Sequence, residues 1–469
     1  MDKEYGVRNP RTGQIDYQIT PPALEHLAIH CKLLRKAQIQ WHQLGIAGRI
    51  ETLQAWKQVL LSEQDDVIQA LIRDTGRKSV SVQEFNSLIS TIDRWCKLAP
   101  TLLSPPDETT TAIPFIHKQH QYIPYSLVGI ISPWNFPLLL SNIDAIPALL
   151  AGCAVVVKPS EITPRFIQPL SATISQVPQL QEVLTYCQGT GETGKTLINY
   201  VDLVCFTGSV ETGRKVAEAA ARRFIPAFLE LGGKDPAIVL ESADLELATS
   251  AILWGSVVNT GQSCFSIERI YVADSIHDQF VDQLIKKAQR LHLAYPTVED
   301  GDIGPIIAEN QAQIIREHLQ DAVAQGAKIC GGGVEERNGG LWCHPTVLTD
   351  VNHSMKIMTE ETFAPIMPIM SFATIEDAVQ LANDTNYGLS AAVFAGRPSE
   401  AIPVASQINA GGISINDAGL TAMIHEAEKH SFKFSGMGGS RMGTAALTRF
   451  IRKKALLVKT NSQPDPWWF

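Results

Sequence analysis

A cysteine and a glutamate in this sequence form a pair that could perform covalent chemistry. Cys264 ends the run Asn259-Thr-Gly-Gln-Ser-Cys264, and Glu230 ends an apolar run and is followed by two glycines. A thiol on a loop can be presented to a substrate, and a nearby carboxylate can accept a proton. The pair predicts attack by the thiol, with the carboxylate handling the proton or a water molecule. The alternative for Cys264 is a small buried apolar residue, since free cysteines often are.

An amide that could assist this thiol lies in Ser132-Pro-Trp-Asn-Phe-Pro137, directly after an apolar run. Asn135 is held close to two prolines, so its side chain offers a rigid donor of the kind that an oxyanion hole needs. On its own, Asn135 would be interpreted as an ordinary turn residue. Its position relative to the thiol therefore decides its role.

Three further segments could hold a nucleotide. Lys158 and Glu161 follow an apolar run, where they could hydrogen-bond a ribose. Phe206-Thr-Gly-Ser209 has a strand–turn–helix pattern that can bring backbone N–H groups to a pyrophosphate. Glu361 and Phe363 could hold a second ribose and the ring beside it. Each segment alone also fits a solvated turn or a surface loop.

Residues 189–196 match the P-loop pattern GxxxxGK(S/T) and also contain GxGxxG. These matches would predict a nucleoside triphosphatase or a dinucleotide site. A P-loop opens a helix of several turns, but only Leu197–Val201 precedes the next apolar run, and Val239-Leu-Glu241 is a weak acidic strand. We expect a glycine turn between a strand and a short helix, and keep the nucleotidase as a remote alternative.

The elements that must position these residues alternate between two periodicities. Residues 22–73 have apolar positions at helical spacing, and from about residue 122 short apolar runs alternate with helical stretches. This alternation predicts a parallel, doubly wound sheet. The helix that starts at Thr163 should be kinked or split by Pro169. The expected strands are 128–131, 154–157, 182–186, 203–206, 227–229, 237–240, 269–273 and 455–459, and the other expected helices are 138–150 and 244–258.

Length and composition exclude several classes of protein. A chain of 469 residues needs two or three domains. The net charge of −9 argues against nucleic acid as a partner. The first residues do not resemble a signal peptide, and the most apolar stretch, 137–157, is too interrupted for a membrane span. The eight cysteines show no CxxC spacing and no clustering with histidine, so we expect reduced thiols, a cytoplasmic location and no metal site.

The motifs PWNFP, KPSE, FTGS, LELGGK, GQSC and EETFAP follow one another in this order. Together they resemble the aldehyde dehydrogenase superfamily over nearly the whole chain, and LELGGK and GQSC are the most specific of them. The resemblance implies an α/β fold with a Rossmann-type parallel-sheet cofactor domain (1–115 and 128–232) and a second α/β catalytic domain (233–430). A β-arm for oligomerisation and the C-terminal tail would comprise 116–127 and 440–469, the arm being a hairpin together with the final strand.

The resemblance also implies oxidation of an aldehyde to its carboxylic acid with NAD or NADP. Cys264 would add to the aldehyde carbon, and Asn135 with the N–H of Cys264 would stabilise the oxyanion of the thiohemiacetal. After hydride transfer to the nicotinamide, Glu230 would activate the water that hydrolyses the thioester. The residues expected around the cofactor are Ser132, Pro133, Trp134, Lys158, Ser160, Glu161, Gly191, Phe206, Thr207, Gly208, Ser209, Leu231, Glu361 and Phe363.

Substrate and cofactor preference depend on smaller features. Phe434–Gly438 and the long tail resemble the class 3 and long-chain branch, so we expect a long-chain, aromatic or isoprenoid aldehyde. Ala364 stands where that family usually has glycine, which could shift cofactor fit slightly. Glu161 favours NAD because a carboxylate repels a 2′-phosphate. Lys158 could reach such a phosphate, so use of both cofactors is expected.

The sequence leaves two other functions open and also suggests which partners the protein binds. A CoA-acylating dehydrogenase would not need Glu230 as a hydrolytic base, and a non-catalytic scaffold would not need Cys264, Glu230 and Asn135 intact. We expect a homo-oligomer, a dimer or a tetramer, that acts on a small aldehyde and binds no nucleic acid. Trp467-Trp-Phe469 could serve as a subunit clasp, a cover for the substrate mouth or a weak membrane contact, in that order of preference.

Overall fold

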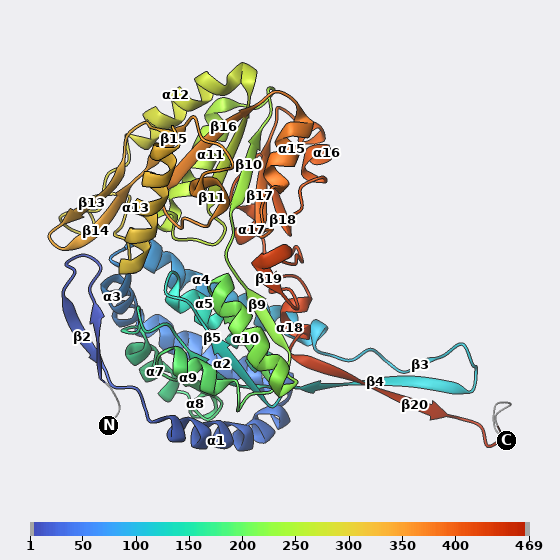
Figure 1. Ribbon diagram of the computed structural model, residues 1–469. Helices are drawn as coiled ribbons and strands as arrows, with labels where there is room; N and C mark the ends of the chain where they lie inside the picture. The colour runs from blue at the N-terminus through green and yellow to red at the C-terminus, as the bar shows by residue number, and fades with distance from the viewer. Residues whose placement is uncertain (1–3, 465–469) are drawn as a thin grey trace.

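The computed structural model describes residues 4–464. Two sheets lie one above the other in Figure 1, and a narrow arm projects from the lower one. The lower sheet has six strands in the order β19-β9-β8-β5-β6-β7, and the upper has seven in the order β12-β15-β16-β11-β10-β17-β18. The predicted α/β class is confirmed. The aromatic ending at 467–469 lies outside the described residues.

The six-stranded sheet is doubly wound. From β5 the chain passes outward through β6 and β7, then returns to the other side of β5 with β8 and β9. Ligands of such sheets bind at the carboxyl ends of the strands where the direction reverses, here between β5 and β8. The strands are β5 (Leu127–Ile131), β6 (Ala154–Lys158), β7 (Leu184–Tyr186), β8 (Leu203–Thr207), β9 (Ala227–Glu230) and the antiparallel β19 (Gly436–Met437).

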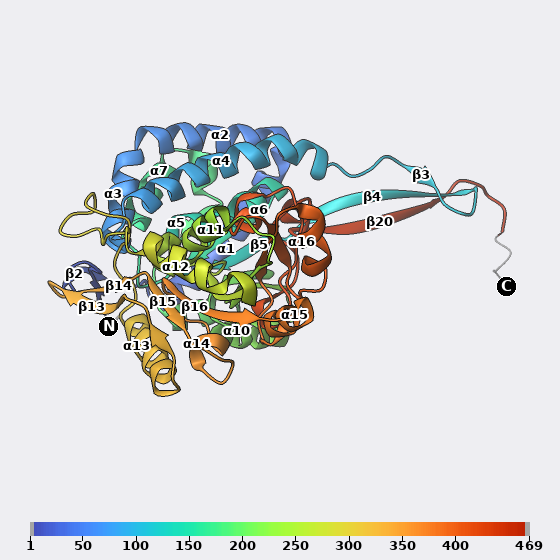
Figure 2. The same cartoon turned by 90° about the horizontal axis from the view of Figure 1, so that it is seen from above.

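Helices cover both faces of this sheet (Figures 1 and 2). All five residues of β6, Ala-Val-Val-Val-Lys, are consequently buried. The helices are α1 (Leu24–Gln43), α2 (Gly45–Ser62), α3 (Gln64–Thr75), α4 (Ser79–Leu102), α5 (Pro137–Asn142), α6 (Ala145–Ala151), α7 (Ile167–Ser175), α8 (Pro178–Gln181), α9 (Gly191–Leu197) and α10 (Val210–Arg223). Among residues 4–464, no helix combines the length and the apolar character needed to cross a bilayer.

The seven-stranded sheet follows in the sequence and has its own apolar core. Its strands are β10 (Asp235–Val239), β11 (Ile267–Ala273), β12 (Lys328–Ile329), β15 (Thr346–Thr349), β16 (Ile366–Phe372), β17 (Ser390–Phe394) and β18 (Gly412–Ile415). Its helices are α11 (Leu245–Val257), α12 (His277–Ala288), α13 (Glu309–Ala324), α14 (Lys356–Thr359), α15 (Ile375–Asn383), α16 (Pro398–Ala405) and α17 (Leu420–Met423). The hairpin of β13 (Gly333–Arg337) and β14 (Gly340–His344) lies beside it in Figure 1, and the hairpin of β1 (Tyr5–Arg8) and β2 (Ile15–Ile19) lies beside the lower half.

The arm is a three-stranded antiparallel sheet in the order β20-β4-β3 (Figure 2). It consists of β3 (Thr109–Thr110), β4 (Ile116–Pro124) and β20 (Ile451–Lys459). Residues 116–124 form a single strand and not a hairpin of their own, because β4 pairs along its whole length with β20. The segment before β20 includes α18 (Ala445–Thr448) and belongs to the core of the lower half.

Several element boundaries differ from those expected. The single helix expected over 138–150 is two helices, α5 and α6, separated by Ile143 and Asp144. The helix expected from Thr163 begins at Ile167, so Pro169 falls in its first turn, where a missing N–H leaves no bond unmade, and no kink follows. Residues 189–196 do form a glycine turn and a helix of seven residues, α9, as expected.

A buried carboxylate joins the C-terminal segment to the six-stranded sheet. Asp144 is fully buried, and Arg441 and Arg449 both bond to it, the former at 2.9 Å. Arg441 also donates to the hydroxyl group of Thr207 at the end of β8. Burial acts to raise the pKa of Asp144, but the two guanidinium groups outweigh it and hold that pKa below its usual range. The cluster therefore holds the segment after β19 against the edge of the sheet.

We expect Asp144→Asn to destabilise the protein strongly, because it leaves two buried guanidinium groups without their counter-charge. Breaking a buried ion pair from one side typically lowers the free energy of unfolding by about 3–5 kcal/mol. The change is measured as a lower midpoint of urea denaturation. Glu211→Gln, which breaks an exposed ion pair with Lys215, is the control and should leave the midpoint unchanged. Equal midpoints for Asp144→Asn and the unmodified protein would contradict the assignment.

Candidate active site

Glu230 and Cys264 lie where the two sheets meet. Glu230 is the last residue of β9, and Leu231–Lys234 carry the chain directly into β10 of the other sheet. Cys264 precedes β11, the parallel neighbour of β10. The carboxyl edge of one sheet thus faces the amino edge of the other, with the predicted base on the first and the predicted nucleophile on the second.

Two glycines allow the segments around these residues to touch. A Cβ atom on Gly233 would lie 2.6 Å from the carbonyl oxygen of Cys264, and one on Gly232 would lie 2.5 Å from Oε2 of Glu361. The N–H of Gly233 also donates to Oε1 of Glu361 at 3.0 Å. The connector after Glu230 therefore packs by its backbone against the nucleophile segment and against a predicted cofactor residue.

The turn before Cys264 has an uncommon backbone conformation. Asn259, Thr260 and Gly261 have φ of 57°, 59° and 66°, which costs a non-glycine residue about 1–3 kcal/mol. The side chain of Asn259 stabilises the turn by donating to the carbonyl groups of Gln262, at 2.9 Å, and Asn135, at 3.1 Å. Its local strain is offset by contacts on both sides.

Asn135, the predicted oxyanion donor, is buried beside this turn. Its side-chain nitrogen donates to the carbonyl oxygen of Gln262 at 3.0 Å, two residues before Cys264. An amide nitrogen carries two N–H groups, so one remains for another acceptor. The structure thus brings Asn135 to the nucleophile loop and fixes the orientation of its amide.

The surroundings of Cys264 keep its thiol protonated. Burial raises the pKa of Cys264 to about 12, the Asp235 carboxylate adds to the rise, Lys429 opposes it, and Glu230 and Glu361 add to it further. The thiolate is the reactive form of a cysteine. A base must therefore accept the proton when the sulfur attacks.

A buried ion pair holds the loop that contains Glu361 and Phe363. Nζ of Lys234 lies 2.7 Å from Oε2 of Glu268 and donates to the hydroxyl group of Thr362 at 3.0 Å. Glu268 accepts the N–H groups of Thr362, at 2.8 Å, and Phe363, at 2.7 Å. Sequence reasoning gave Lys234 and Glu268 no role. A charged residue inside the apolar run of β11 is the signal that could have revealed Glu268.

Glu361 is a second perturbed carboxyl group in the site. Burial raises the pKa of Glu361 to about 8, and the nearby Glu268 contributes in the same direction. The N–H of Gly233 and the Lys234 ammonium group act against this rise. The Glu361 carboxyl group is thus held next to Gly232 and Gly233.

The reversal point of the six-stranded sheet gathers several of the predicted nucleotide residues. Ser132, Pro133 and Trp134 follow β5, and Gly208 and Ser209 follow β8. Within residues 4–464, the buried hydroxyl group of Ser132 has no hydrogen-bond partner. An unpaired buried hydroxyl beside a sheet's reversal point is consistent with a bound polar ligand.

Ion pairing, capping and ring contacts fix the edges of this region. Nζ of Lys158 lies 2.6 Å from Oε2 of Glu161 at the end of β6. The hydroxyl group of Ser209 accepts the N–H of Thr212 and caps α10, so its first-turn N–H groups face the same edge. The rings of Trp134 and Phe363 meet edge to face at 5.5 Å, although they come from different sheets. These features fit a dinucleotide that spans both halves.

Five predicted residues have other surroundings. Phe206 and Leu231 are buried apolar side chains, and the hydroxyl group of Thr207 is taken by Arg441. The hydroxyl group of Ser160 accepts the N–H of Ile162. Gly191 is exposed at the start of α9 with open space around it.

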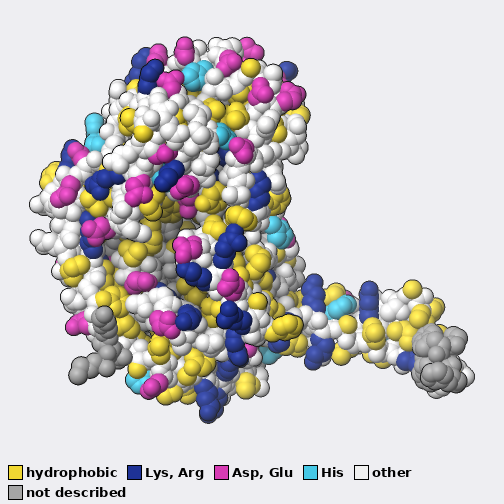
Figure 3. Space-filling view, viewed as in Figure 1, with side chains coloured by type: hydrophobic (Ala, Val, Ile, Leu, Met, Phe, Trp, Pro, Cys, Tyr) yellow, Lys and Arg dark blue, Asp and Glu magenta, His cyan; other side chains and the backbone are white. Residues whose placement is uncertain are grey.

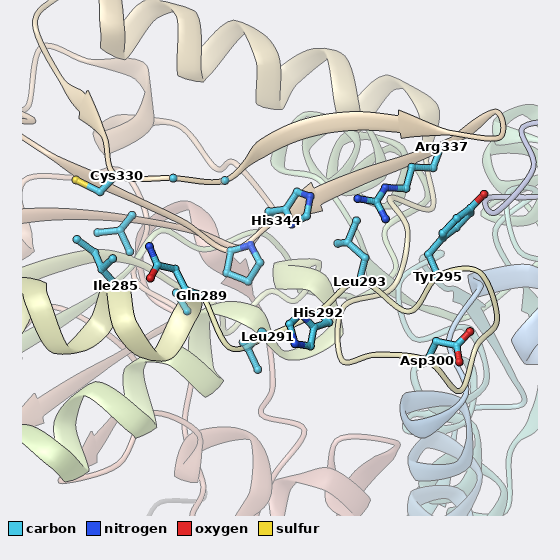
Figure 4. Close-up of a pocket in the computed structure, with 15 residues that line it drawn as sticks. Ile285, Gln289, Leu291, His292, Leu293, Tyr295, Asp300, Cys330, Arg337 and His344 are labelled. Atoms are coloured by element: carbon cyan, nitrogen blue, oxygen red, sulfur yellow. The ribbon is translucent and has the colours of Figure 1, made fainter.

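A cavity lies away from Cys264, in the half that contains the seven-stranded sheet. It has a volume of about 550 Å³ and opens between the end of α12, the loop after it and the β13–β14 hairpin, where His344 and Arg337 project into it (Figure 4). Glu335 pairs with His344 at 3.0 Å and with Arg337 at 2.5 Å. Glu335 therefore pairs with both of these side chains, and Cys264 is not part of the cavity lining.

Known proteins share this fold and these motifs. A model of the aldehyde dehydrogenase family matches residues 1–456, and the chain therefore belongs to this family. 4,4′-Diapolycopene aldehyde oxidase of Methylomonas sp is 36% identical over 445 residues, which cover 93% of this chain and 82% of the relative. A protein of Mycobacterium ulcerans provisionally named succinate-semialdehyde dehydrogenase [NADP(+)] 2 is 32% identical, with 92% and 84% covered.

Solved structures agree with this assignment. PutA of Anabaena variabilis, provisionally described as an aldehyde dehydrogenase, has a TM-score of 0.98 and 66% identity, and both chains are covered completely. Betaine aldehyde dehydrogenase of Staphylococcus aureus, solved in complex with NAD+, has a TM-score of 0.93 and 30% identity, with 99% of this chain and 94% of that chain covered. The chain is accordingly an oxidoreductase that acts on an aldehyde, as its motifs predicted.

We expect alkylation of Cys264 by iodoacetamide to accelerate about tenfold for each pH unit between pH 7 and 10, because only the thiolate reacts and its share grows in this way below the pKa. The raised pKa means that the neutral thiol predominates throughout this range. The rate is followed by mass spectrometry of the peptide that contains Cys264. A plateau near pH 8 would show that the thiol ionises far more readily than its burial implies.

Proposed function

We propose that the protein oxidises an apolar aldehyde to its carboxylic acid with NAD+ or NADP+, using Cys264 as nucleophile, Asn135 as oxyanion donor and Glu230 as base. The observation that carries the proposal is the contact of the Glu230 connector with the Cys264 segment, through the missing side chain of Gly233. It supports the idea that one base serves both the thiol and its acyl derivative.

In this mechanism the sulfur of Cys264 forms a bond to the aldehyde carbon, and the thiol proton passes to Glu230. The free N–H of Asn135 and the backbone N–H of Cys264 stabilise the oxyanion of the thiohemiacetal, and a donor of this kind is typically worth about 3–4 kcal/mol of barrier. When bound, the nicotinamide supplies the acceptor for the hydride that leaves this carbon. Cys264 then holds the acyl group as a thioester, and Glu230 releases the thiol proton to solvent. Glu230 next takes a proton from the attacking water and returns it to the departing sulfur, which releases the acid and the free thiol.

The cofactor would span both halves of the molecule. Lys158 and Glu161 would hold its adenine-side ribose, and the first turn of α10 after Ser209 would hold the pyrophosphate. Glu361 and Phe363 would hold the nicotinamide side, supported by the Lys234–Glu268 pair. Of the relatives above, one is named for NADP+ and one was solved with NAD+, which supports the use of either.

An apolar wall beside Cys264 supports an apolar substrate. Phe265 follows the nucleophile and stacks on Trp254 of α11 with ring centroids 6.5 Å apart. Trp254 is 42% exposed, and Gly419, just before α17, packs against its indole ring. Further exposed apolar side chains follow on from this contact, namely Leu420, Met423 and Ile424. Exposed apolar patches often mark binding regions for apolar groups, which supports this substrate class.

The arm supports a homo-oligomer, a dimer or a tetramer. The side chain of Leu457 is 70% exposed on β20, and β20 forms an open edge of the arm sheet. Lys and Arg side chains occur along the arm in Figure 3. Exposed sheet edges readily pair with another chain, so we infer that a second copy covers this one. Eight free cysteines support a reducing, cytoplasmic setting.

Glu230→Gln should slow hydrolysis of the thioester by about 10²–10⁴-fold, the usual contribution of a general base. It should slow formation of the thioester less, because the small share of thiolate that forms without this base is itself a strong nucleophile. A burst of reduced nicotinamide equal to the enzyme concentration is then followed by a slow steady state in stopped-flow absorbance. Cys264→Ala is the control and should give neither phase. A Glu230→Gln enzyme with an unaltered steady state would remove Glu230 from this role.

The same assay tests the nearest alternative. Coenzyme A is added to the unmodified enzyme, and the products are separated by chromatography. The hydrolytic proposal requires free acid as the product in both samples. Acyl-CoA in excess over free acid would instead identify a CoA-acylating dehydrogenase.

Trp254→Ala should lower kcat/KM about tenfold or more for a long-chain aldehyde such as decanal, with a much smaller effect on acetaldehyde, because only the longer chain reaches the apolar wall. Leu247→Ala, an exposed apolar residue at the other end of α11, is the matched control. Rates are followed by nicotinamide absorbance with NAD+ and with NADP+. Equal losses for the two aldehydes would argue against the apolar wall as a substrate surface.

A further inference from the structure

The Glu230 carboxylate has one hydrogen-bond partner within residues 4–464, and it is not a residue that the motifs predict. Oγ of Ser431 donates to Oε2 of Glu230 at 2.9 Å, and both residues are half-buried. In the same part of the chain, no group hydrogen-bonds to Oε1 of Glu230. One oxygen of the carboxylate is therefore held, and the other remains free to accept a proton.

The backbone around Ser431 is fixed relative to Glu230. Gly436 of β19 pairs directly with Glu230 of β9, and the N–H of Leu231 donates to the carbonyl group of Ser435 at 2.8 Å. A Cβ atom on Gly436 would lie 2.7 Å from Cβ of Ser431. Ser431 therefore lies over the strand that pairs with the base, and the geometry of the hydroxyl and the carboxylate is set before any ligand arrives.

The other charged groups near Glu230 act on it from a distance. Arg441, which follows β19, interacts electrostatically with Glu230, but its guanidinium group bonds to Asp144 and to the hydroxyl group of Thr207. The Cys264 thiol is the other titratable group that interacts with Glu230. Among these groups, Ser431 is the one that contacts the carboxylate itself.

We propose that Ser431 is a positioning residue for the catalytic base, an inference that rests on the proposed role of Glu230. A hydroxyl group that donates to a carboxylate favours its ionised form. The bond also restricts rotation of the Glu230 side chain, so that Oε1 faces the water that attacks the thioester. Ser431 thus keeps the base aimed at that water.

The test is the hydrolysis of an acyl-enzyme that forms without cofactor. p-Nitrophenyl acetate acylates the Cys264 thiol with release of p-nitrophenol, and the thioester is then hydrolysed to acetate. In Ser431→Ala we expect the acidic limb of the hydrolysis rate to move up by about half to one pH unit, since one hydrogen bond to the ionised base is lost. The plateau should fall about threefold to tenfold, as orientation is lost. Ser431→Thr keeps the hydroxyl group and should restore both.

Ser435→Ala is the matched control, because Ser435 lies in the same segment but its hydroxyl group accepts the N–H of Gly388 instead of touching Glu230. It should leave the pH of the acidic limb unchanged, even if it lowers the melting temperature. In a Glu230→Gln background, Ser431→Ala should have no further effect on the pH profile.

The outcomes separate this inference from the function on which it rests. If Glu230→Gln slows hydrolysis but Ser431→Ala leaves the pH profile in place, the base stands and the role of Ser431 is refuted. If hydrolysis is faster in Ser431→Ala at every pH, the hydroxyl group restrains Glu230, and the inference is equally refuted. If Glu230→Gln hydrolyses the acyl-enzyme at the normal rate, both proposals fall.

Discussion

The ion pair between Lys234 and Glu268 is the interaction on which the site depends. Both side chains are almost fully buried, and an unpaired charge in such a place would be strongly destabilising. Lys234 ends the connector that begins at Glu230, and Glu268 lies in the strand that follows Cys264. Because Glu268 also accepts the N–H groups of Thr362 and Phe363, one pair fixes the segments of Glu230 and Cys264 and the loop at Thr362 relative to each other.

Close backbone contacts complete what the ion pair begins. A side chain on Gly232 or Gly233 would collide with Glu361 or with the Cys264 segment, and one on Gly261 would lie 2.2 Å from the carbonyl carbon of Ala364. Three segments from distant parts of the chain therefore meet by their main chains. Since a displacement of about 1 Å can reduce catalysis about a hundredfold, these glycines matter as much as the reacting groups.

The sequence predicts those features that depend on short local segments and misses those that depend on contacts between distant segments. Cys264, Glu230 and Asn135 each stand in a short segment at a strand end, so local pattern and motif order predict them, together with the doubly wound sheet. Ser431 and Arg441 reach the site only because β19 pairs with β9, a contact between distant segments that periodicity does not report. Ser209 shows a different limit, since its hydroxyl group caps a helix and only its backbone surroundings suit a phosphate.

The arm also affects how the protein folds while it is being synthesised on the ribosome. β20 pairs residue by residue with β4, and Ala446, Leu447 and Phe450 fill the core that the first half of the chain builds. When every strand from β5 to β9 has been synthesised, the nascent chain therefore still lacks part of its core. The N-terminal half stays incompletely packed until the last residues have left the ribosome. We expect this delay to make the nascent chain a client of chaperones and to leave C-terminal truncations prone to degradation.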